Sequence, residues 1–477
     1  MTRIALAALV SCVVIASTAG AQESTPGAAI HNEGGDIHKS CVEDKAIVGC
    51  AATFFTDHPF HVAVGTIAPQ NGVGIGPAFV WHWTPANDSP TNRSTTKWQW
   101  SGSVDAVGTS SSAWRVGAFA SVVRADVELP QPITPGSGRR PVRIRIHPYP
   151  VFKLYSQSIS LPQLLFFGIG PNTAVSDKSF FGQRESVTGG AVVWPIAPDN
   201  NFDRLVLSLV GEVNGRWVSI RSGPSGDSPS IEHVYTEATA PGLSSQPGFV
   251  QFGEGVRIAP SLAGGHLRLN YFARYQQFQA PSDSLSSFQR WAVDLNHEIP
   301  IYGSSIPGGK DHNTANDCSI SPSDLKCPPV ALSRNRSGSI TLRALMSRSV
   351  VSGGGVVPFY FQQTIGGSDL DGNRVLPSYE DYRFRGPNLV LFQETFEHSL
   401  FGSPIGLWLA ADQGQVSQQQ TGLNFTNLAH SWGIGLTLRA GGLPVGLMTY
   451  STGPEGHHFA VTISPTLLGG SSRPALQ

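Results

Sequence analysis

The sequence predicts an all-β protein, a single transmembrane antiparallel β-barrel of sixteen strands. Segments along the chain alternate apolar and polar residues with a period of two, which is typical of strands with two different faces. The chain has 53 Gly in 477 residues and only 14% charged residues, a composition that favours strands joined by many turns. After residue 21 there is no run of about 18 apolar residues, so the chain would have to cross a membrane as a closed barrel.

The first element is a secretory signal peptide at residues 1–21. Arg3 supplies the positive start, residues 4–16 are apolar, and residues 19–21 (Ala-Gly-Ala) form a small-x-small cleavage site. The segment is too short and wrongly flanked for a resident membrane helix, and a buried N-terminal helix is the weaker alternative. Its removal leaves about 455 residues, enough for one large barrel or for two or three ordinary domains.

Cysteine spacing agrees with export. One cysteine lies in the signal peptide, and the other four form two close pairs, Cys41 with Cys50 and Cys318 with Cys327. Each pair can close a small loop as a disulfide in an oxidising compartment. A metal site is the alternative, although the spacings are not those of a zinc ribbon or finger.

The strand faces can be assigned from the alternation. In residues 431–439 the apolar side chains Trp432, Ile434, Leu436 and Leu438 share one face, opposite Ser431, Gly433, Gly435, Thr437 and Arg439. Segments 142–147, 266–276 and 290–298 alternate in the same way, the second interrupted by Phe272. A soluble sandwich also alternates, but here the polar faces combine Arg with Asp or Glu, as in a wet lumen, and Trp or Tyr stands near strand ends.

Sixteen strands can be placed along the chain, an even number as single-chain bacterial barrels require. They are expected at 59–68, 72–84, 97–109, 112–125, 141–156, 178–196, 203–220, 247–261, 264–280, 286–300, 337–350, 388–400, 404–412, 430–440, 443–452 and 457–467.

A series of short motifs follows in order along the same strands and loops. They are Phe-Phe-Gly-Ile-Gly at 166–170, Pro-Phe-Tyr at 358–360 with Ile-Gly-Gly at 365–367, Asp-Tyr-Arg-Phe-Arg-Gly at 381–386, Leu-Ala-Ala-Asp-Gln-Gly at 409–414 and Ser-Trp-Gly-Ile-Gly-Leu at 431–436. In this order the chain resembles the barrel of the BamA/TamA outer-membrane assembly superfamily, also called bacterial surface antigens. The resemblance is closest over residues 350–467. It implies sixteen strands and a long sixth extracellular loop at 351–387.

The sixth loop departs from the pattern of that superfamily, whose loop carries an Arg-Gly pair that meets acidic residues in the lumen. Residues 376–379 (Leu-Pro-Ser-Tyr) stand in place of that pair. The resemblance puts Asp412 at one acidic position and Thr395 at the other, with Glu394 and Glu397 beside it. Arg383 or Arg385 is expected to take the role of the missing Arg, through a charge-assisted contact that pins the loop. The alternative is that these charges only line a wet lumen.

The resemblance also assigns the remaining regions. Residues 22–58 form a short periplasmic segment, too short for one POTRA domain of the kind the superfamily carries. Residues 59–468 form the outer-membrane barrel, and residues 469–477 form a C-terminal tail. Loops 157–177, 221–246 and 351–387 would lie outside the cell, and residues 301–336 would lie in the periplasm.

No motif for catalysis or for a cofactor is found. The sequence lacks a Gly-x-Ser-x-Gly elbow, a His-Glu-x-x-His helix and a Walker loop, so neither an enzyme nor a cofactor is expected. Residues 369–380 begin like a calcium loop, but Arg374 takes the sixth position, which requires Gly, and a turn is the simpler explanation of Asp-Gly-Asn. The pair His457-His458 is expected at the surface or in the lumen, and no metal site is expected.

Two functions remain open. The resemblance implies a barrel that assists protein insertion or translocation at the outer membrane, with outer-membrane lipid and unfolded outer-membrane proteins as partners. A barrel-only channel or structural protein without an assembly role is the alternative. The formal net charge of −1 speaks against a nucleic-acid partner.

Overall fold

The computed structural model describes residues 60–83, 94–128, 144–145, 150–196, 207–224, 226–263, 266–306, 334–369, 372–400, 405–440 and 443–463. The predicted signal peptide, the segment 22–58 and the tail 469–477 lie outside these residues. Among the described residues no helix is long and apolar enough to cross a membrane.

The cysteines of the two predicted disulfides also lie outside the described residues. Cys41 and Cys50 precede the first described strand, and Cys318 and Cys327 fall between residues 306 and 334. Both pairings, Cys41 with Cys50 and Cys318 with Cys327, therefore stay predictions, and nothing in the described part of the chain depends on them.

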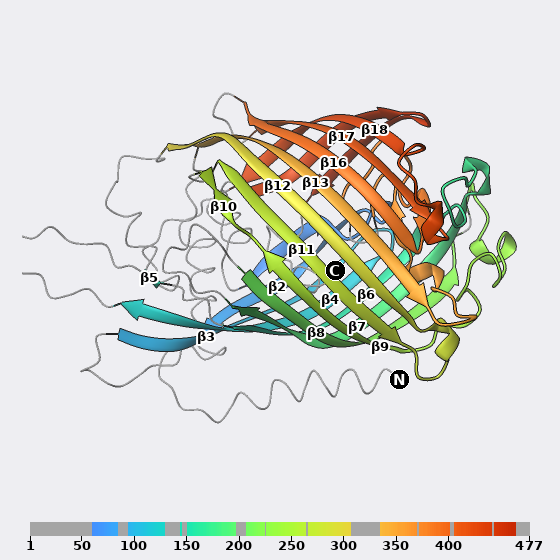
Figure 1. Cartoon of the computed structure of the whole chain (residues 1–477), viewed down its shortest axis with the longest axis horizontal. Helices are drawn as coiled ribbons and strands as arrows, with labels where there is room; N and C mark the ends of the chain where they lie inside the picture. Colours follow the sequence, from blue (N-terminus) through green and yellow to red (C-terminus); the bar gives the residue numbers. More distant parts are fainter. Residues whose placement is uncertain are drawn as a thin grey trace, which may run out of the picture.

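The chain forms one antiparallel barrel wall of sixteen long strands, which confirms the predicted number (Figure 1). The strands are β1 (Phe60–Thr66), β2 (Val73–Trp83), β3 (Ser94–Gly108), β4 (Trp114–Glu128), β6 (Val151–Phe166), β7 (Ser179–Pro195), β8 (Leu207–Ser222), β9 (Phe249–Ile258), β11 (Leu267–Gln279), β12 (Phe288–Ile306), β13 (Arg334–Val351), β16 (Asn388–Ser399), β17 (Ile405–Ser417), β18 (Ala429–Ala440), β19 (Leu443–Gly453) and β20 (Gly456–Ile463). Each pairs with the next along the chain.

Short elements decorate this wall. β5 (Ile144–Arg145) pairs with β4, β10 (Ser261–Leu262) pairs with β11, and β14 (Gln363–Ile365) forms a separate two-stranded ribbon with β15 (Phe384–Gly386). Short 3-10 helices lie in the loops, at Val175–Asp177, Ile231–His233, Ser284–Ser286, Phe359–Phe361 and Gln420–Gly422. These loops gather at one end of the barrel, at the right of Figure 1, which is called the loop end below.

The strand faces agree with the alternation predicted for β18. Trp432 is 58% exposed and Ile434 is 51% exposed, whereas Ser431 and Thr437 on the opposite face are buried. The apolar face therefore points out of the barrel and the small polar face points into the lumen. A soluble sandwich would bury its apolar faces, so an apolar exterior is the arrangement of a barrel surrounded by lipid.

Phe272, which interrupts the predicted alternation, belongs to the lumen face of β11. Its neighbours on that face are polar, and its ring lies under the guanidinium of Arg257, 5.0 Å from the ring centroid. The predicted alternation at 142–147 is described only as the backbone of β5, at residues 144–145. A ring on the inner face is thus explained by a stacking partner and leaves the period of two intact.

An apolar core closes the loop end. It joins the ends of β6, β7, β9, β11 and β12 to the loop between β13 and β16, here called the sixth loop (residues 352–387). Its largest buried rings are Tyr382, Phe166, Phe167, Phe181, Phe249 and Phe359. Several of these rings meet edge to face, as Phe166 and Phe359 do with centroids 5.2 Å apart. The lumen is therefore covered at this end by packed side chains.

The wall has one weak joint, between its first and last strands. Among the described residues no strand pairing joins β20 to β1, although every other neighbouring pair of long strands forms a ladder. The two strands meet where the backbone N–H of Ile463 donates to Thr66 Oγ1 at 3.3 Å. This joint is called the seam below.

Candidate functional site

The sixth loop enters the lumen as a narrow ribbon. β14 and β15 pair from Gln363 with Gly386 to Ile365 with Phe384. The chain then turns at Gly366 and Gly367, whose φ angles are +113° and +60°. A Cβ on Gly366 would lie 2.5 Å from Arg383 Cβ, so the two arms of the loop approach as closely as glycine allows. This close approach is what lets the loop fit inside the barrel.

Arg383 ties the sixth loop to two other loops. Its guanidinium forms an ion pair with Glu455, in the turn between β19 and β20, with the closest N–O distance at 2.8 Å. It also donates to Thr173 Oγ1 at 2.7 Å and lies over the ring of Phe167, 5.0 Å from the centroid. The predicted loop arginine therefore has a carboxylate partner that pins the loop, and that partner is Glu455.

Arg385 is buried in the apolar core. Its Nη1 donates to the carbonyl of Phe359 at 2.7 Å, and the rings of Phe166, Phe181 and Phe359 surround the guanidinium at 5.6–5.9 Å. Its own carbonyl accepts the N–H of Gly170 at 2.7 Å. Burial lowers the pKa of this side chain to about 9. Arg385 thus joins the sixth loop to the Phe-Phe-Gly-Ile-Gly segment, the first motif of the predicted series.

Asp412, on the lumen face of β17, binds the backbone of the sixth loop through its carboxylate. Its Oδ2 accepts the N–H of Leu376 at 2.8 Å and the side-chain amide of Gln393 at 3.3 Å. The sequence predicts Arg383 or Arg385 as the partner of Asp412, whereas the contact that forms is with the run 376–379 that replaces the Arg-Gly pair. A backbone N–H supplies the hydrogen bond to this buried carboxylate.

Glu394 lies outside the lumen, and its prediction as a lumen contact is corrected by the strand geometry. Gln393 points inward, toward Asp412, so the next residue must point outward. Glu394 is exposed there, between Phe392 and Phe396 on the same face of β16. It is a carboxylate on the lipid-facing wall of the barrel.

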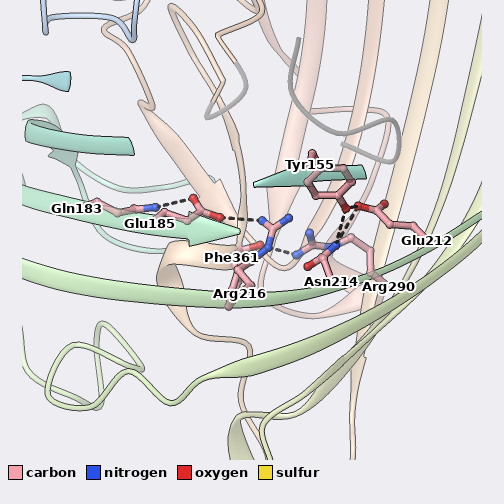
Figure 2. Close-up of polar contacts among 8 residues, drawn as sticks. All are labelled: Tyr155, Gln183, Glu185, Glu212, Asn214, Arg216, Arg290 and Phe361. Atoms are coloured by element: carbon pink, nitrogen blue, oxygen red, sulfur yellow. Dashed lines mark hydrogen bonds and ion pairs between the residues drawn. The ribbon is translucent and has the colours of Figure 1, made fainter. Parts of the chain in front are cut away.

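A second cluster of polar side chains lines the opposite wall, on β6, β7 and β8 (Figure 2). Tyr155 donates to Glu212, which also accepts the side-chain amide of Asn214 at 2.9 Å. Arg216 forms an ion pair with Glu185 at 2.9 Å. All of these side chains face inward and are buried or nearly so, and each carboxylate has a donor beside it.

Arg290, on β12, binds the base of the sixth loop. It donates to the carbonyl of Phe361 (Figure 2). Through Nε it also donates to Ser349 Oγ at 3.2 Å. The rings of Phe278 and Phe288 lie 5.4 and 5.3 Å from its guanidinium. Beside the loop is a cavity of about 270 Å³, lined by arginine, glutamine and asparagine together with apolar side chains.

The sequence indicates some of these residues only as members of a polar face. Arg290 and Arg274 stand on the predicted lumen faces of their strands, but nothing local indicates that they line one cavity. Glu455 follows a Gly-Pro pair and resembles an ordinary turn residue. The alternation along a strand indicates which side chains face the lumen. It does not indicate their partners, because these lie on distant strands.

No metal centre is formed by the described residues: no group of three or more His, Cys, Asp or Glu gathers there. Within residues 369–380, Asp369 accepts the N–H of Asn373 at 2.8 Å, which is the turn expected as the simpler explanation of that segment. His457 lies on the outer face of β20, stacked on Tyr450 with centroids 5.7 Å apart.

No protein-family model matches the chain, and no curated protein matches it. Similar solved structures include CdiB from Acinetobacter baumannii (11% identity, TM-score 0.43), BamA from Haemophilus ducreyi lacking POTRA domains 1-3 (9% identity, TM-score 0.43) and CdiB from Escherichia coli (11% identity, TM-score 0.46). Each alignment covers 85% of this chain, and respectively 59%, 69% and 62% of the other. The chain therefore spans less than two thirds of either CdiB structure. One of these structures is a BamA, a member of the superfamily whose barrel motifs the sequence resembles.

Proposed function

We propose that this protein is an outer-membrane barrel that assists the insertion or translocation of other proteins, and that it does so by opening at the seam between β1 and β20. Its partners would be outer-membrane lipid and unfolded outer-membrane proteins. The loop end would face the cell exterior, and the segment before β1 would lie in the periplasm.

The observation that carries the proposal is the missing ladder between β1 and β20. A closed barrel ordinarily pairs its last strand with its first, because an unpaired strand edge in lipid leaves backbone groups without partners. An edge held by little more than a hydrogen bond to Thr66 is inexpensive to open. An incoming strand could then pair with the exposed edge, which is the geometry of β-strand addition.

The position of the sixth loop favours this assembly function rather than a permanently open channel. Its tip lies behind the seam, where Asp381 accepts a hydrogen bond from Gln70 in the β1–β2 turn at 3.3 Å. Arg383 holds the turn that leads into β20. The loop thus contacts both sides of the seam while it occupies the lumen, so a movement of the loop would bear on seam and lumen together.

The test is to lock the seam. A Thr66→Cys/Ile463→Cys pair places two thiols where the strands meet, on the same outer face. In a strain depleted of the native protein, the oxidised variant is expected to leave the levels of other outer-membrane barrels low, and the reduced variant is expected to restore them. The matched control is Val64→Cys/Ile75→Cys, which links paired residues of the β1–β2 hairpin and leaves the seam free.

Planar-bilayer recordings address the alternative of a channel or structural barrel. The assembly proposal predicts a low resting current, because the loop and its apolar core fill one end of the lumen. Full complementation by the locked variant, together with a steady ion current from the purified protein, would overturn it in favour of a channel.

A further inference from the structure

We propose that the cavity between the sixth loop and the wall formed by β7–β13 is a binding site for a small multivalent oxyanion bearing phosphate groups. The proposal does not depend on the opening of the seam. It rests on the charge, the geometry and the unsatisfied donors of the cavity.

Five successive strands each contribute one arginine to the cavity. They are Arg216 on β8, Arg257 on β9, Arg274 on β11, Arg290 on β12 and Arg343 on β13. The acidic residues in the same lining are Glu185, Asp294 and Asp369. The cavity therefore carries an excess of positive charge in a site walled by protein, where a fixed charge acts more strongly than it does in bulk water. An arginine fork matches the geometry of phosphate oxygens.

The arginines are held in place before any ligand arrives. Arg216 and Arg343 are oriented by ion pairs, with Glu185 at 2.9 Å and with Asp294 at 2.7 Å. Arg257 lies over the Phe272 ring at 5.0 Å, which orients the plane of its guanidinium. A site with little side-chain freedom left to lose binds its ligand at a lower entropic cost.

Arg257 also retains an unused donor. Its Nε is buried and has no hydrogen-bond partner among the described residues, and Glu254, the nearest acid along β9, points to the outer face. A buried N–H without a partner costs roughly 1–3 kcal/mol, which an oxyanion in the cavity would relieve. The volume of about 270 Å³ lies just below the usual range for ligand pockets, so the cavity suits a small anion.

The cavity can be reached from the end opposite the loops. Arg268 and Glu298 occupy the next lumen-facing positions beyond the lining residues Asn270 and Asn296. Their side chains are 57% and 39% exposed although they face the lumen, so water reaches this depth. A soluble anion can follow the same path to the arginines.

The test is titration calorimetry of the full-length protein in detergent with inorganic pyrophosphate, at an ionic strength held constant with chloride. Pyrophosphate is expected to bind, and Arg257→Gln is expected to weaken binding by about tenfold or more, the loss of one charged hydrogen bond. Arg257→Lys keeps the charge without the fork and is expected to give an intermediate loss. Short-chain phosphatidic acid, titrated in parallel, distinguishes a lipid headgroup from a free phosphate as the source of the anion.

The matched control is Arg268→Gln, which removes a lumen arginine outside the cavity and should leave binding within about twofold of the wild type. Heat-modifiable migration in gels checks that each variant has folded. If Arg257→Gln does not fold, Arg274→Gln is tested in its place. The proposal fails if neither phosphate compound binds, or if Arg268→Gln weakens binding as much as Arg257→Gln does.

Discussion

The two halves of the barrel interior are built from opposite kinds of side chain. Along β18 and β19 most lumen-facing residues are small, among them Ser431, Gly433, Gly435, Thr437, Thr449 and Ser451. Along β8, β9, β11, β12 and β13 they include long polar and charged side chains, and each of these five strands contributes one arginine to the cavity. The sixth loop lies against the first half, and the cavity lies beside the second.

This contrast explains how one barrel holds both a plug and a wet cavity. Small side chains leave room for the loop backbone, and their hydroxyls serve it: Ser431 Oγ accepts the N–H of Ser378 at 2.9 Å, and Thr449 Oγ1 accepts from Arg374 at 2.6 Å. Arginines repel one another and are most stable with water, anions or acidic partners between them, so a cavity remains on that side of the lumen. Substitutions in each region test the contrast.

The largest effect is expected from removing the anchor of the plug. Arg383→Ala leaves Glu455 and Thr173 without their donor, and breaking a largely buried ion pair costs on the order of 3–5 kcal/mol. We expect a lower midpoint of urea unfolding and frequent current openings in planar bilayers. The double variant Arg383→Met/Glu455→Met should recover much of the unfolding midpoint. An Arg383→Ala protein with an unchanged unfolding midpoint and no additional current openings would show that other contacts hold the loop.

A smaller loss is expected from filling the small-residue half. A Cβ on Gly433 would lie 2.8 Å from the Trp408 ring, which occupies the lumen beside it. Gly433→Val should therefore cost about 1–3 kcal/mol through overpacking, measured by urea unfolding in detergent. Gly353→Val is the control, since no atom lies within 4 Å of the Cβ position there. Equal stability of the two variants would mean that this half is not tightly packed.

The outer face offers a gain in stability. Glu394 stands between Phe392 and Phe396 on the lipid-facing wall, where a carboxylate costs roughly 1–2 kcal/mol. Glu394→Leu should raise the stability in lipid vesicles by about that amount. Glu254→Leu, on the outer face beside the tilted ring pair of Tyr275 and Trp291, should gain less, because charges cost less near the membrane interface. A loss of stability in Glu394→Leu would mean that the Glu394 carboxylate makes a stabilising contact.

The smallest effect concerns Asp381 in the sixth loop, whose pKa is raised by burial. The folded state then holds its proton more tightly than the unfolded state, so stability falls as pH rises from the unfolded pKa through the raised one. Asp381→Asn keeps an acceptor for Gln70 and should be slightly more stable than wild type at pH 7, a gain lost below about pH 4. Asp227→Asn, exposed in a loop, is the matched control. If the stabilities of Asp381→Asn and wild type changed with pH in the same way, the prediction would be contradicted.

Local periodicity in the sequence predicts the wall of this barrel well. The backbone of a strand turns successive side chains to opposite faces. The faces of Trp432 and Ser431 can therefore be assigned without knowing which residues they contact. The same rule, applied from Gln393, places Glu394 outside. The sixth loop is also foreseeable as a unit, from the glycines at 366 and 367 and the basic stretch that ends it.

The number of strands, their faces and the residues that enter the lumen can thus be predicted from the amino-acid sequence, because these properties follow from backbone geometry over a few residues. Which lumen residues meet depends on the tertiary fold. Arg383 finds Glu455, 72 positions away, and Asp412 holds the backbone of Leu376, because barrel closure and the path of the loop bring them together. Likewise, one arginine from each of five strands becomes a single charged cavity only when the wall curves. Contacts across a lumen depend on curvature and shear, which no local pattern of residues encodes.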